Sequence, residues 1–407
     1  FYIPKNVTYL NVATLGPMPK FALESSVNEW KLLESNPCEL YDWDDIPPPR
    51  ESRLDMVRKK AAFMLGVDDV NELALVQSTT YAFHMIAQGL VSSGYLLRGN
   101  EQWVLTTNME HPGGLSAWKH QVKSGFLSGI DYVTIPAPAN SEESITQLFD
   151  AALRSKPKGH YKIVSVSHVL TTTGMIMPIR SIASLAHQHG ALLVVDGAQS
   201  TGSVIGLNLA TSGADAYTIS GHKGLLGPTG SGFLYVQSKI KKYIQPGMLD
   251  DGYSGYEHSG GTAPLQTILG LGYSIDFIEA AGGLNEVAKH GQQLAIHTQK
   301  GLLRLSKKFP GLIMLSPPPH NQLNSHGMLS SIVSVAMPPN VGVKDVIENL
   351  KDEQGRFVVK LLSSHGGVFN NALRVSYHMY NSLNDVNRFL LSLEASLEEL
   401  GCDTSTE

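Results

Sequence analysis

A carboxylate and a lysine, each placed just after a strand-like segment, are the two residues of this chain best suited to do chemistry together. Asp196 ends the apolar run 191–195, and Lys223 comes shortly after the strand-like run 216–219. A strand buried on both faces brings its last residue to the carboxyl edge of a parallel sheet, where ligands of open α/β sheets bind. A carboxylate there can keep a pyridinium nitrogen protonated, and a lysine can form a Schiff base with an aldehyde. We therefore predict an aldehyde cofactor held between Asp196 and Lys223, although either residue alone would more simply be a turn-capping acid or a solvated lysine.

Two short motifs extend the pattern around this pair. Asp196-Gly197-Ala198-Gln199 and Ser220-Gly221-His222-Lys223, followed by Gly227-Pro228 and Gly230, resemble the class V aminotransferase family. This group of fold-type-I pyridoxal-phosphate (PLP) enzymes includes cysteine desulfurases, isopenicillin N epimerase-like proteins and carbon–sulfur lyases. The resemblance extends from about Tyr9 to about Asp385, so it implies the cofactor and the fold for nearly the whole chain. It leaves the reaction open.

The resemblance also implies a cofactor cradle. Lys223 would form the Schiff base, Asp196 would pair with the pyridine nitrogen, and Gln199 would bind the phenolic oxygen. His111 matches the family histidine that stacks on the ring, and a flat imidazole suits an electron-poor ring; a buried or capping histidine is the alternative. The other implied contacts are Thr79, Thr80, Ser220 and His222 at the phosphate, Thr171 at the phenolic oxygen, and Thr262 at the phosphate of the neighbouring subunit. If Thr262 has that role, the protein is an obligate homodimer.

The phosphate contact at Thr79 and Thr80 has a physical basis in the sequence itself. The two threonines follow the strand-like run 73–76 and open the helix-like run 81–87. Free amide donors and the positive end of the helix dipole favour a phosphate dianion at such a position. A plain helix N-cap is the alternative, and both can hold together.

Substrate binding is implied at the other end of the chain. Arg374 matches the family arginine that binds the substrate α-carboxylate, for which a planar bidentate guanidinium is well shaped. This role implies an amino-acid substrate, while a structural salt bridge is the competing interpretation. The N-terminal segment that contains Asn11 and Ala13 resembles the family's pocket-lining opening segment, so these two residues are further substrate-binding candidates.

The sequence departs from the cysteine desulfurases in two places. Those enzymes carry a nucleophilic cysteine on a loop before the arginine, but the only cysteines here are Cys38 and Cys402, and neither falls in the region 355–371. A serine cannot replace a thiolate as sulfur acceptor, so desulfurase activity of the usual kind is not expected. At Thr171 the desulfurases have an asparagine that touches the phenolic oxygen; a threonine hydroxyl could make the same hydrogen bond.

Composition fits an enzyme of this size. The formal net charge of −5 gives no basic face for nucleic acid, and two cysteines argue against a disulfide framework. No apolar run approaches the roughly 18 residues of a membrane helix. We expect no metal, no membrane and no nucleic-acid partner, and a cytoplasmic location; because the chain begins at Phe1, a targeting leader could have been trimmed.

Strand-like and helix-like segments alternate along the chain, which is typical of a doubly wound, mostly parallel α/β sheet. Segment 162–168 reads as a strand, 179–189 as a helix ending at Gly190, and 191–196 as the next strand. The expected organisation is an N-terminal segment 1–20 lining the active site, a large PLP-binding domain 21–265 and a small C-terminal α/β domain 266–407. A long helix from about Leu265 to the break at Ala280 would connect the last two, and a helix from Asn384 to Leu400 would end the small domain.

Three reactions remain open for an amino acid that loses its α-proton to Lys223. They are β-elimination, epimerisation or racemisation, and transamination. We favour β-elimination with carbon–sulfur cleavage, by analogy with cysteine-free relatives that are lyases. Epimerisation would need a second base facing Lys223, for which His365, His378 and Tyr380 are the candidates. A PLP-binding protein without catalysis is disfavoured, since it would have no reason to keep Arg374.

Overall fold

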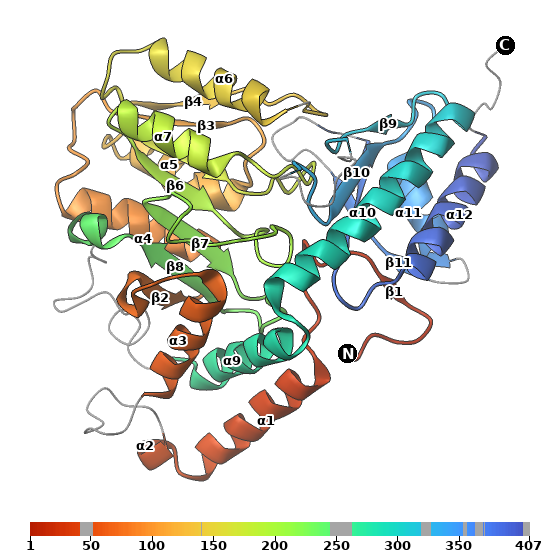
Figure 1. Cartoon of the computed structure of the whole chain (residues 1–407), viewed down its shortest axis with the longest axis horizontal. Helices are drawn as coiled ribbons and strands as arrows, with labels where there is room; N and C mark the ends of the chain where they lie inside the picture. Colours follow the sequence, from red (N-terminus) through yellow and green to blue (C-terminus); the bar gives the residue numbers. More distant parts are fainter. Residues whose placement is uncertain are drawn as a thin grey trace.

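The computed structural model describes residues 1–40, 52–139, 141–244, 263–318, 327–352, 356–362, 369 and 371–401. Figure 1 shows a larger lobe built around one sheet and a smaller lobe that contains the C-terminal part of the chain. Thr262 and His365 lie outside the described residues. Their roles therefore stay predictions.

The larger lobe contains a seven-stranded sheet in the order β2-β8-β7-β6-β5-β3-β4. Neighbouring strands from β4 to β7 run parallel, and β8 pairs antiparallel with both β7 and β2. The strands are β2 (Leu73–Val76), β3 (Trp103–Thr107), β4 (Gly129–Val133), β5 (Tyr161–Ser167), β6 (Leu192–Asp196), β7 (Ala216–Ser220) and β8 (Gly232–Val236). The predicted doubly wound, mostly parallel sheet is confirmed.

Helices cover both faces of this sheet, because side chains along each central strand alternate between two apolar clusters. Val194 packs with α4 (Thr79–Ser92) and α5 (Pro112–Lys123) on one face. Leu193 and Val195 pack in the cluster on the other face. The helices that contribute to this second cluster are α1 (Lys20–Ser35), α3 (Arg53–Leu65), α6 (Glu142–Arg154), α7 (Ile179–Gln188) and α9 (Leu265–Ala280).

The smaller lobe contains the four-stranded antiparallel sheet β12-β13-β10-β9. Its elements are β9 (Ile313–Met314), β10 (Ile332–Ala336), β12 (Lys360–Leu362), β13 (Ala372–Ser376), α10 (Gly283–Lys308), α11 (Val343–Asp352) and α12 (Leu383–Glu399). Short elements complete the chain: β1 (Thr8–Tyr9), α2 (Pro37–Leu40), η1 (Val70–Glu72), η2 (Ser238–Tyr243) and β11 (Phe357–Val358). Because β1 pairs with β11 and Leu10 packs in the smaller lobe's core, the N-terminal segment passes between the lobes and reaches the site described below.

Helix ends in the structure follow from local sequence. The last helix, α12, begins with a capping box in which Ser382 and Asp385 exchange side-chain and backbone hydrogen bonds. Helix α7 ends at Gln188 and is followed by Gly190 with φ 78°, a conformation that favours glycine. The expected helices near 179–189, 265–280 and 384–400 are thus confirmed within one or two residues. The predicted domain boundary after residue 265 falls at the start of α9, which packs against α1 and α3.

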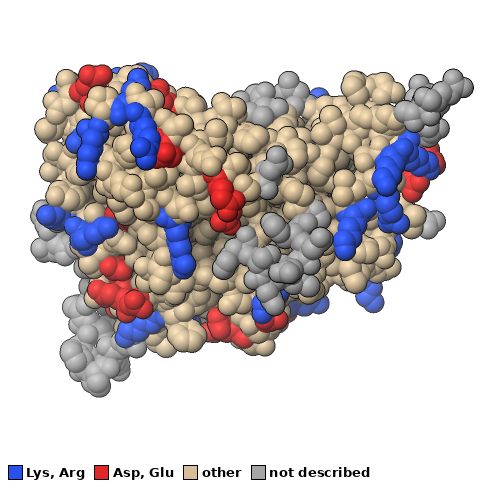
Figure 2. Space-filling model, turned by 45° about the horizontal axis from the view of Figure 1, so that its top comes forward, with Lys and Arg blue, Asp and Glu red and all other residues tan. Residues whose placement is uncertain are grey.

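Surface charge is mixed on the face drawn in Figure 2, where lysine and arginine gather in separate small groups beside acidic residues. In the part of the chain that the structure describes, no helix is long and apolar enough to cross a bilayer.

Candidate active site

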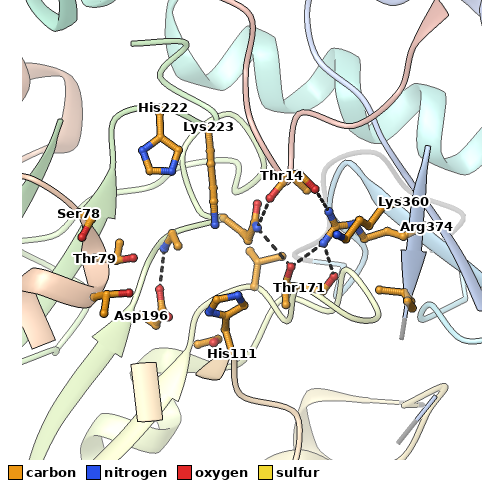
Figure 3. Close-up of a pocket in the computed structure, with 17 residues that line it drawn as sticks. Thr14, Ser78, Thr79, His111, Thr171, Asp196, His222, Lys223, Lys360 and Arg374 are labelled. Carbon is orange, nitrogen blue, oxygen red and sulfur yellow. Dashed lines mark hydrogen bonds between the residues drawn. The ribbon is translucent and has the colours of Figure 1, made fainter. Parts of the chain in front are cut away.

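A cavity of about 280 Å³ opens where the central parallel strands end. Figure 3 shows side chains from both lobes pointing into it. Its lining comes from the N-terminal segment, the start of α4, His111 before α5, the ends of β5 and β6, the loop after β7, and strands β12 and β13. This is the carboxyl edge of the sheet, where ligands of open α/β folds bind.

Asp196 is the last residue of β6 and lies buried at the floor of this cavity. Its Oδ1 atom accepts a hydrogen bond from the Ala198 N–H at 2.9 Å. Burial raises the pKa of the Asp196 carboxyl, while this N–H and the charge of Lys223 oppose the rise. A cationic group bound against the carboxyl would stabilise its charged form.

Lys223 lies on the loop after β7, and Figure 3 shows its side chain in the middle of the cavity between Asp196 and Arg374. Among the described residues, no hydrogen-bond acceptor contacts its ammonium group. Burial lowers the pKa of Lys223 to about 8; the negative charge of Asp196 opposes the fall and the positive charge of Arg374 adds to it. A lysine in this state is mostly charged near pH 7 but keeps a larger neutral fraction than an ordinary lysine, and the neutral form is the one that acts as a nucleophile or a base.

Two histidines lie on opposite sides of the lysine. His111 is the N-cap of α5, and its Nδ1 atom accepts the Gly113 N–H at 3.0 Å. The capping interpretation is confirmed, and this histidine also lines the cavity. Its stacking on a cofactor ring stays a prediction. Burial and the charge of Lys223 lower the pKa of His222 to about 4, so its imidazole is neutral near pH 7.

Hydroxyl groups gather at the amino end of α4. Thr79 and Thr80 line the cavity as expected, together with Ser78, whose Oγ atom accepts the Tyr81 N–H at 3.1 Å as the helix N-cap. This end of α4 offers amide donors and a positive dipole to an anion. Ser220 contributes differently: it is buried behind the cavity wall, and its Oγ atom lies 3.2 Å from His222 Nε2.

Arg374 projects from β13 at the far side of Lys223 and is 4% exposed. Its Nη1 atom donates to the carbonyl and hydroxyl oxygens of Thr171 at 3.0 and 2.7 Å, and Nη2 donates to Thr14 Oγ1 at 2.8 Å and Asn11 Oδ1 at 3.3 Å. Its Nε atom is buried without a hydrogen-bond partner. Burial lowers the pKa of Arg374 to about 10, with Tyr9 opposing the fall.

No carboxylate of the described residues pairs with this guanidinium, so the structural salt bridge considered above is not found there. A buried cation held only by neutral groups loses much of its solvation without recovering it from an opposite charge. An anionic ligand would supply that charge.

Thr171 and Gln199 connect the arginine to the middle of the cavity. Thr171 Oγ1 accepts hydrogen bonds from Arg374 and, at 3.3 Å, from Gln199 Nε2, which also donates to the Ala13 carbonyl at 2.7 Å. A threonine hydroxyl accepts two hydrogen bonds and donates one. With both acceptor positions used, the Thr171 hydroxyl hydrogen is available to a ligand in the cavity, as its predicted contact with a phenolic oxygen requires.

The structure also places residues in the cavity that the sequence interpretation missed. They are Ser78, Thr14, Ser167, Val169, Ala198, Lys360 and Leu362. Ser78 could have been found as the N-cap before Thr79, and Thr14 belongs to the same N-terminal motif as Asn11. Lys360 lies in the region that was searched only for a cysteine, and its strand pairing with Arg374 was not evident from the sequence.

Two of the three candidate second bases do not line the cavity. His378 is 1% exposed, its Nε2 atom donates to the Gly224 carbonyl at 3.0 Å, and its ring stacks on Tyr380. The Tyr380 hydroxyl is buried without a hydrogen-bond partner. His378 contacts the loop of Lys223 through Gly224, and Tyr380 packs against His378 and Tyr9.

Comparison with known proteins supports one family. Residues 50–389 match the family model Aminotransferase class-V. The chain is 27% identical over 357 residues to a probable cysteine desulfurase of Halalkalibacterium halodurans, covering 84% of this chain and 82% of that protein. It is 28% identical over 364 residues to a probable cysteine desulfurase of Pyrococcus abyssi, with 84% and 83% covered.

Solved structures show the same fold. An apo structure of cysteine desulfurase from Thermococcus onnurineus superposes with a TM-score of 0.77 at 25% identity, covering 97% of this chain and 95% of that chain. A complex of the cystine carbon–sulfur lyase C-DES with cysteine persulfide gives a TM-score of 0.77 at 19% identity, with 96% and 98% covered.

The cavity fits the cofactor of this family. Lys223 offers an amine with no acceptor among the described residues, Asp196 offers a buried carboxylate for a pyridine nitrogen, and the amino end of α4 offers donors for a phosphate. Arg374 then remains for the carboxylate of a substrate. This chain belongs to the class V aminotransferase family of enzymes, and its cofactor is pyridoxal phosphate.

Proposed function

We propose that this protein is a carbon–sulfur lyase, which removes a sulfur substituent from Cβ of an amino acid by β-elimination and releases a keto acid, ammonia and a thiol. The observation that carries the proposal is the arrangement of Lys223 between Asp196 and Arg374 in a cavity whose described lining contains no thiol. A single base, an electron sink and a carboxylate clamp are what elimination requires.

Lys223 is the base of the proposed reaction. Its Nζ atom takes the proton from the substrate Cα, and a pKa of about 8 leaves a useful fraction of the amine neutral at pH 7 to 8. When bound, PLP supplies an electron sink for the negative charge that deprotonation leaves at Cα. Asp196 keeps the site negative beneath that sink, and its burial makes this charge effective because little water screens it.

Arg374 orients the substrate. Its guanidinium would donate hydrogen bonds to the α-carboxylate, and its hydrogen bonds to Thr171, Thr14 and Asn11 fix its orientation. The Nε–H is the one donor of this group without a partner among the described residues. Holding the carboxylate in one place directs the Cα–H bond toward Lys223. The C–S bond at Cβ then breaks, and its electron pair leaves with the sulfur.

The sulfur departs as a free thiol because the described residues place no protein thiol at the site. Cys38 lies exposed on α2 and does not line the cavity, and Cys402 lies outside the described residues near the end of the chain. A cystine C-S lyase with the same fold supports the proposal by analogy. Epimerisation has no comparable support, since neither His378 nor Tyr380 lines the described cavity.

The experiment is a stoichiometry measurement on S-alkyl-L-cysteines and L-cystine. Keto acid, ammonia and thiol or persulfide should appear in equal amounts, and Lys223→Ala should abolish all three. Cys38→Ser should change none of them. Exchange of the α-proton or formation of the D-isomer without keto acid would instead establish an epimerase, and amino transfer to an added keto acid would establish an aminotransferase.

We also propose that the enzyme works as a homodimer. On α1, Leu23, Val27 and Trp30 recur at helical spacing and are 37%, 41% and 54% exposed. An exposed apolar stripe of this kind is typical of an interface. Thr262, which the family resemblance assigns to the partner's phosphate, requires the same assembly.

Sedimentation tests this assembly. The protein should sediment at twice the 44.1 kDa of one chain. Val27→Lys should shift it toward the single chain, while Leu391→Lys, at a leucine 67% exposed on α12, should not. A wild-type protein that sediments as one chain at micromolar concentration would contradict the proposal.

A further inference from the structure

The cavity contains a second cation that the proposed reaction does not use. Lys360 begins β12 and pairs directly with Arg374 on β13. Side chains alternate along a strand, so Lys360 and Leu362 face the cavity while Leu361 packs against the core of the smaller lobe. Figure 3 shows Lys360 beside Arg374, with Ser78 and Thr79 on the other side of Lys223.

This pair of cations is unfavourable without a ligand. Residues directly opposite on antiparallel strands have Cβ atoms roughly 5 Å apart, and like charges at such positions are destabilising. No acceptor or acidic partner of Lys360 is found among the described residues, and Asp196 is the only acid in the described cavity lining. A purely structural role would not place an unpaired lysine next to an unpaired arginine.

The charges of the expected ligands leave Lys360 unassigned. Asp196 is matched by a pyridine nitrogen, the amino end of α4 by a phosphate, and Arg374 by an α-carboxylate. Lys360 lies on the Arg374 side of the cavity, away from Ser78 and Thr79 at the amino end of α4. Leu362, two residues further along the same strand, adds an apolar side chain to the cavity wall beside Lys360.

We propose that Lys360 binds a second anionic group at the far end of the substrate side chain. The substrate class is then a β-sulfur amino acid whose sulfur substituent ends in a carboxylate or a similar anion. This inference rests on the proposed function, and it names the substrate of that same site.

The test uses two substrates that differ only in this charge. S-carboxymethyl-L-cysteine ends in a carboxylate, and S-carbamoylmethyl-L-cysteine ends in an amide of nearly the same shape. Elimination from the first, with one water, gives pyruvate, ammonia and mercaptoacetate. The measured quantity is the acid-to-amide ratio of kcat/KM for pyruvate release by the PLP-loaded enzyme, and comparing this ratio between variants cancels the difference between the two leaving groups.

The wild-type enzyme should prefer the acid, and Lys360→Met should lower the ratio by about tenfold to a hundredfold, the range for a charged hydrogen bond. The substitution should raise KM for the acid substrate and leave kcat/KM for the amide substrate unchanged. Lys360→Arg should restore most of the ratio, and Lys351→Met, at an exposed lysine on α11, should leave it alone. A ratio that Lys360→Met does not change would overturn the proposal.

A binding measurement separates this inference from the proposed reaction. L-glutamate and L-glutamine can be titrated against the PLP-loaded protein while the cofactor absorbance is followed, whether or not any keto acid forms from sulfur substrates. Tighter binding of glutamate than glutamine, lost in Lys360→Met, would support the anion site even if elimination failed. If the wild-type enzyme and Lys360→Met each bound glutamate and glutamine equally well while elimination still occurred, the anion site would be overturned and the proposed reaction would stand.

Discussion

Lys223 and Arg374 are both buried cations. Asp196 lies near Lys223, but no acidic side chain of the described residues pairs with Arg374. Burial lowers the pKa of Lys223 to about 8 and that of Arg374 to about 10. Each residue keeps its site destabilised until a ligand arrives, so ligand binding recovers free energy that folding lost. Capture of the aldehyde and capture of the carboxylate are favoured for the same physical reason.

The lowered pKa of Lys223 predicts how fast the apoenzyme takes up PLP. Only the neutral amine attacks an aldehyde, so the uptake rate should rise with pH and level off above about 8, well below the ordinary lysine value of 10.5. Stopped-flow absorbance between pH 6.5 and 10 measures this midpoint. A rate that keeps rising to pH 10 would mean that the lysine is not desolvated.

The geometry of Arg374 predicts a binding defect for a conservative change. Arg374→Lys keeps one charge but loses the planar fork that donates to Thr171, Thr14 and Asn11. KM for the amino acid should rise by about tenfold to a hundredfold. PLP uptake should be unchanged, and an enzyme with unaltered KM would remove Arg374 from the substrate site.

At the scale of elements, the loop that carries Lys223 is held by close backbone contacts. A Cβ atom at Gly224 would overlap the carbonyl oxygen of Thr201, and the Gly224 carbonyl accepts the His378 ring N–H from the smaller lobe. Gly224 has no positive φ, so its backbone conformation does not by itself require glycine. What requires glycine at this position is the lack of space.

Gly224→Ala should therefore displace the lysine loop. We expect a loss of about 1–3 kcal/mol in the free energy of unfolding, with slower PLP uptake. Gly99→Ala is a control, because Gly99 has φ 82° and no atom within 4 Å of an added Cβ, and it lies outside the cavity. It should lose some stability through backbone strain, yet take up PLP at the normal rate.

The helices and strands that could be predicted from the sequence are those with a single clear pattern of apolar residues. The apolar strand ending at Asp196 and the helix near 265–280 were predictable because burial on both faces and helical spacing leave few alternatives. Lys360 was not predictable as a site residue: its position depends on the register of β12 against β13, and a three-residue strand has too little pattern to reveal its partner. The partners of Arg374 were hidden likewise, since Thr171 and Thr14 lie 203 and 360 residues before it in the sequence.

At the scale of the whole molecule, two buried histidines should each reduce the free energy of unfolding in mild acid. His168 and His378 are buried, and burial lowers the pKa of each from 6.5 to about 4. Between these values the unfolded chain binds more protons than the folded chain, so the free energy of unfolding falls as pH decreases from 6.5 to 4. Each histidine should lose about 2 kcal/mol of stabilisation by pH 5.

Urea unfolding at pH 7 and pH 5 measures this dependence. His378→Gln keeps a side-chain donor for the Gly224 carbonyl but removes the titrating ring, so its stability should change less with pH than that of the wild type. An unchanged pH dependence in this variant would mean that His378 does not contribute to the acid sensitivity.

The whole site combines residues from both lobes around one lysine, and the products formed from one substrate test this account most directly. Incubating the PLP-loaded enzyme with L-cystine and quantifying pyruvate against alanine by NMR separates elimination from desulfuration in a single sample. The account predicts pyruvate and ammonia in equal amounts, no alanine, and no product with Lys223→Ala. Alanine as the main product would contradict it, because sulfur would then be transferred to an acceptor that the described cavity lacks.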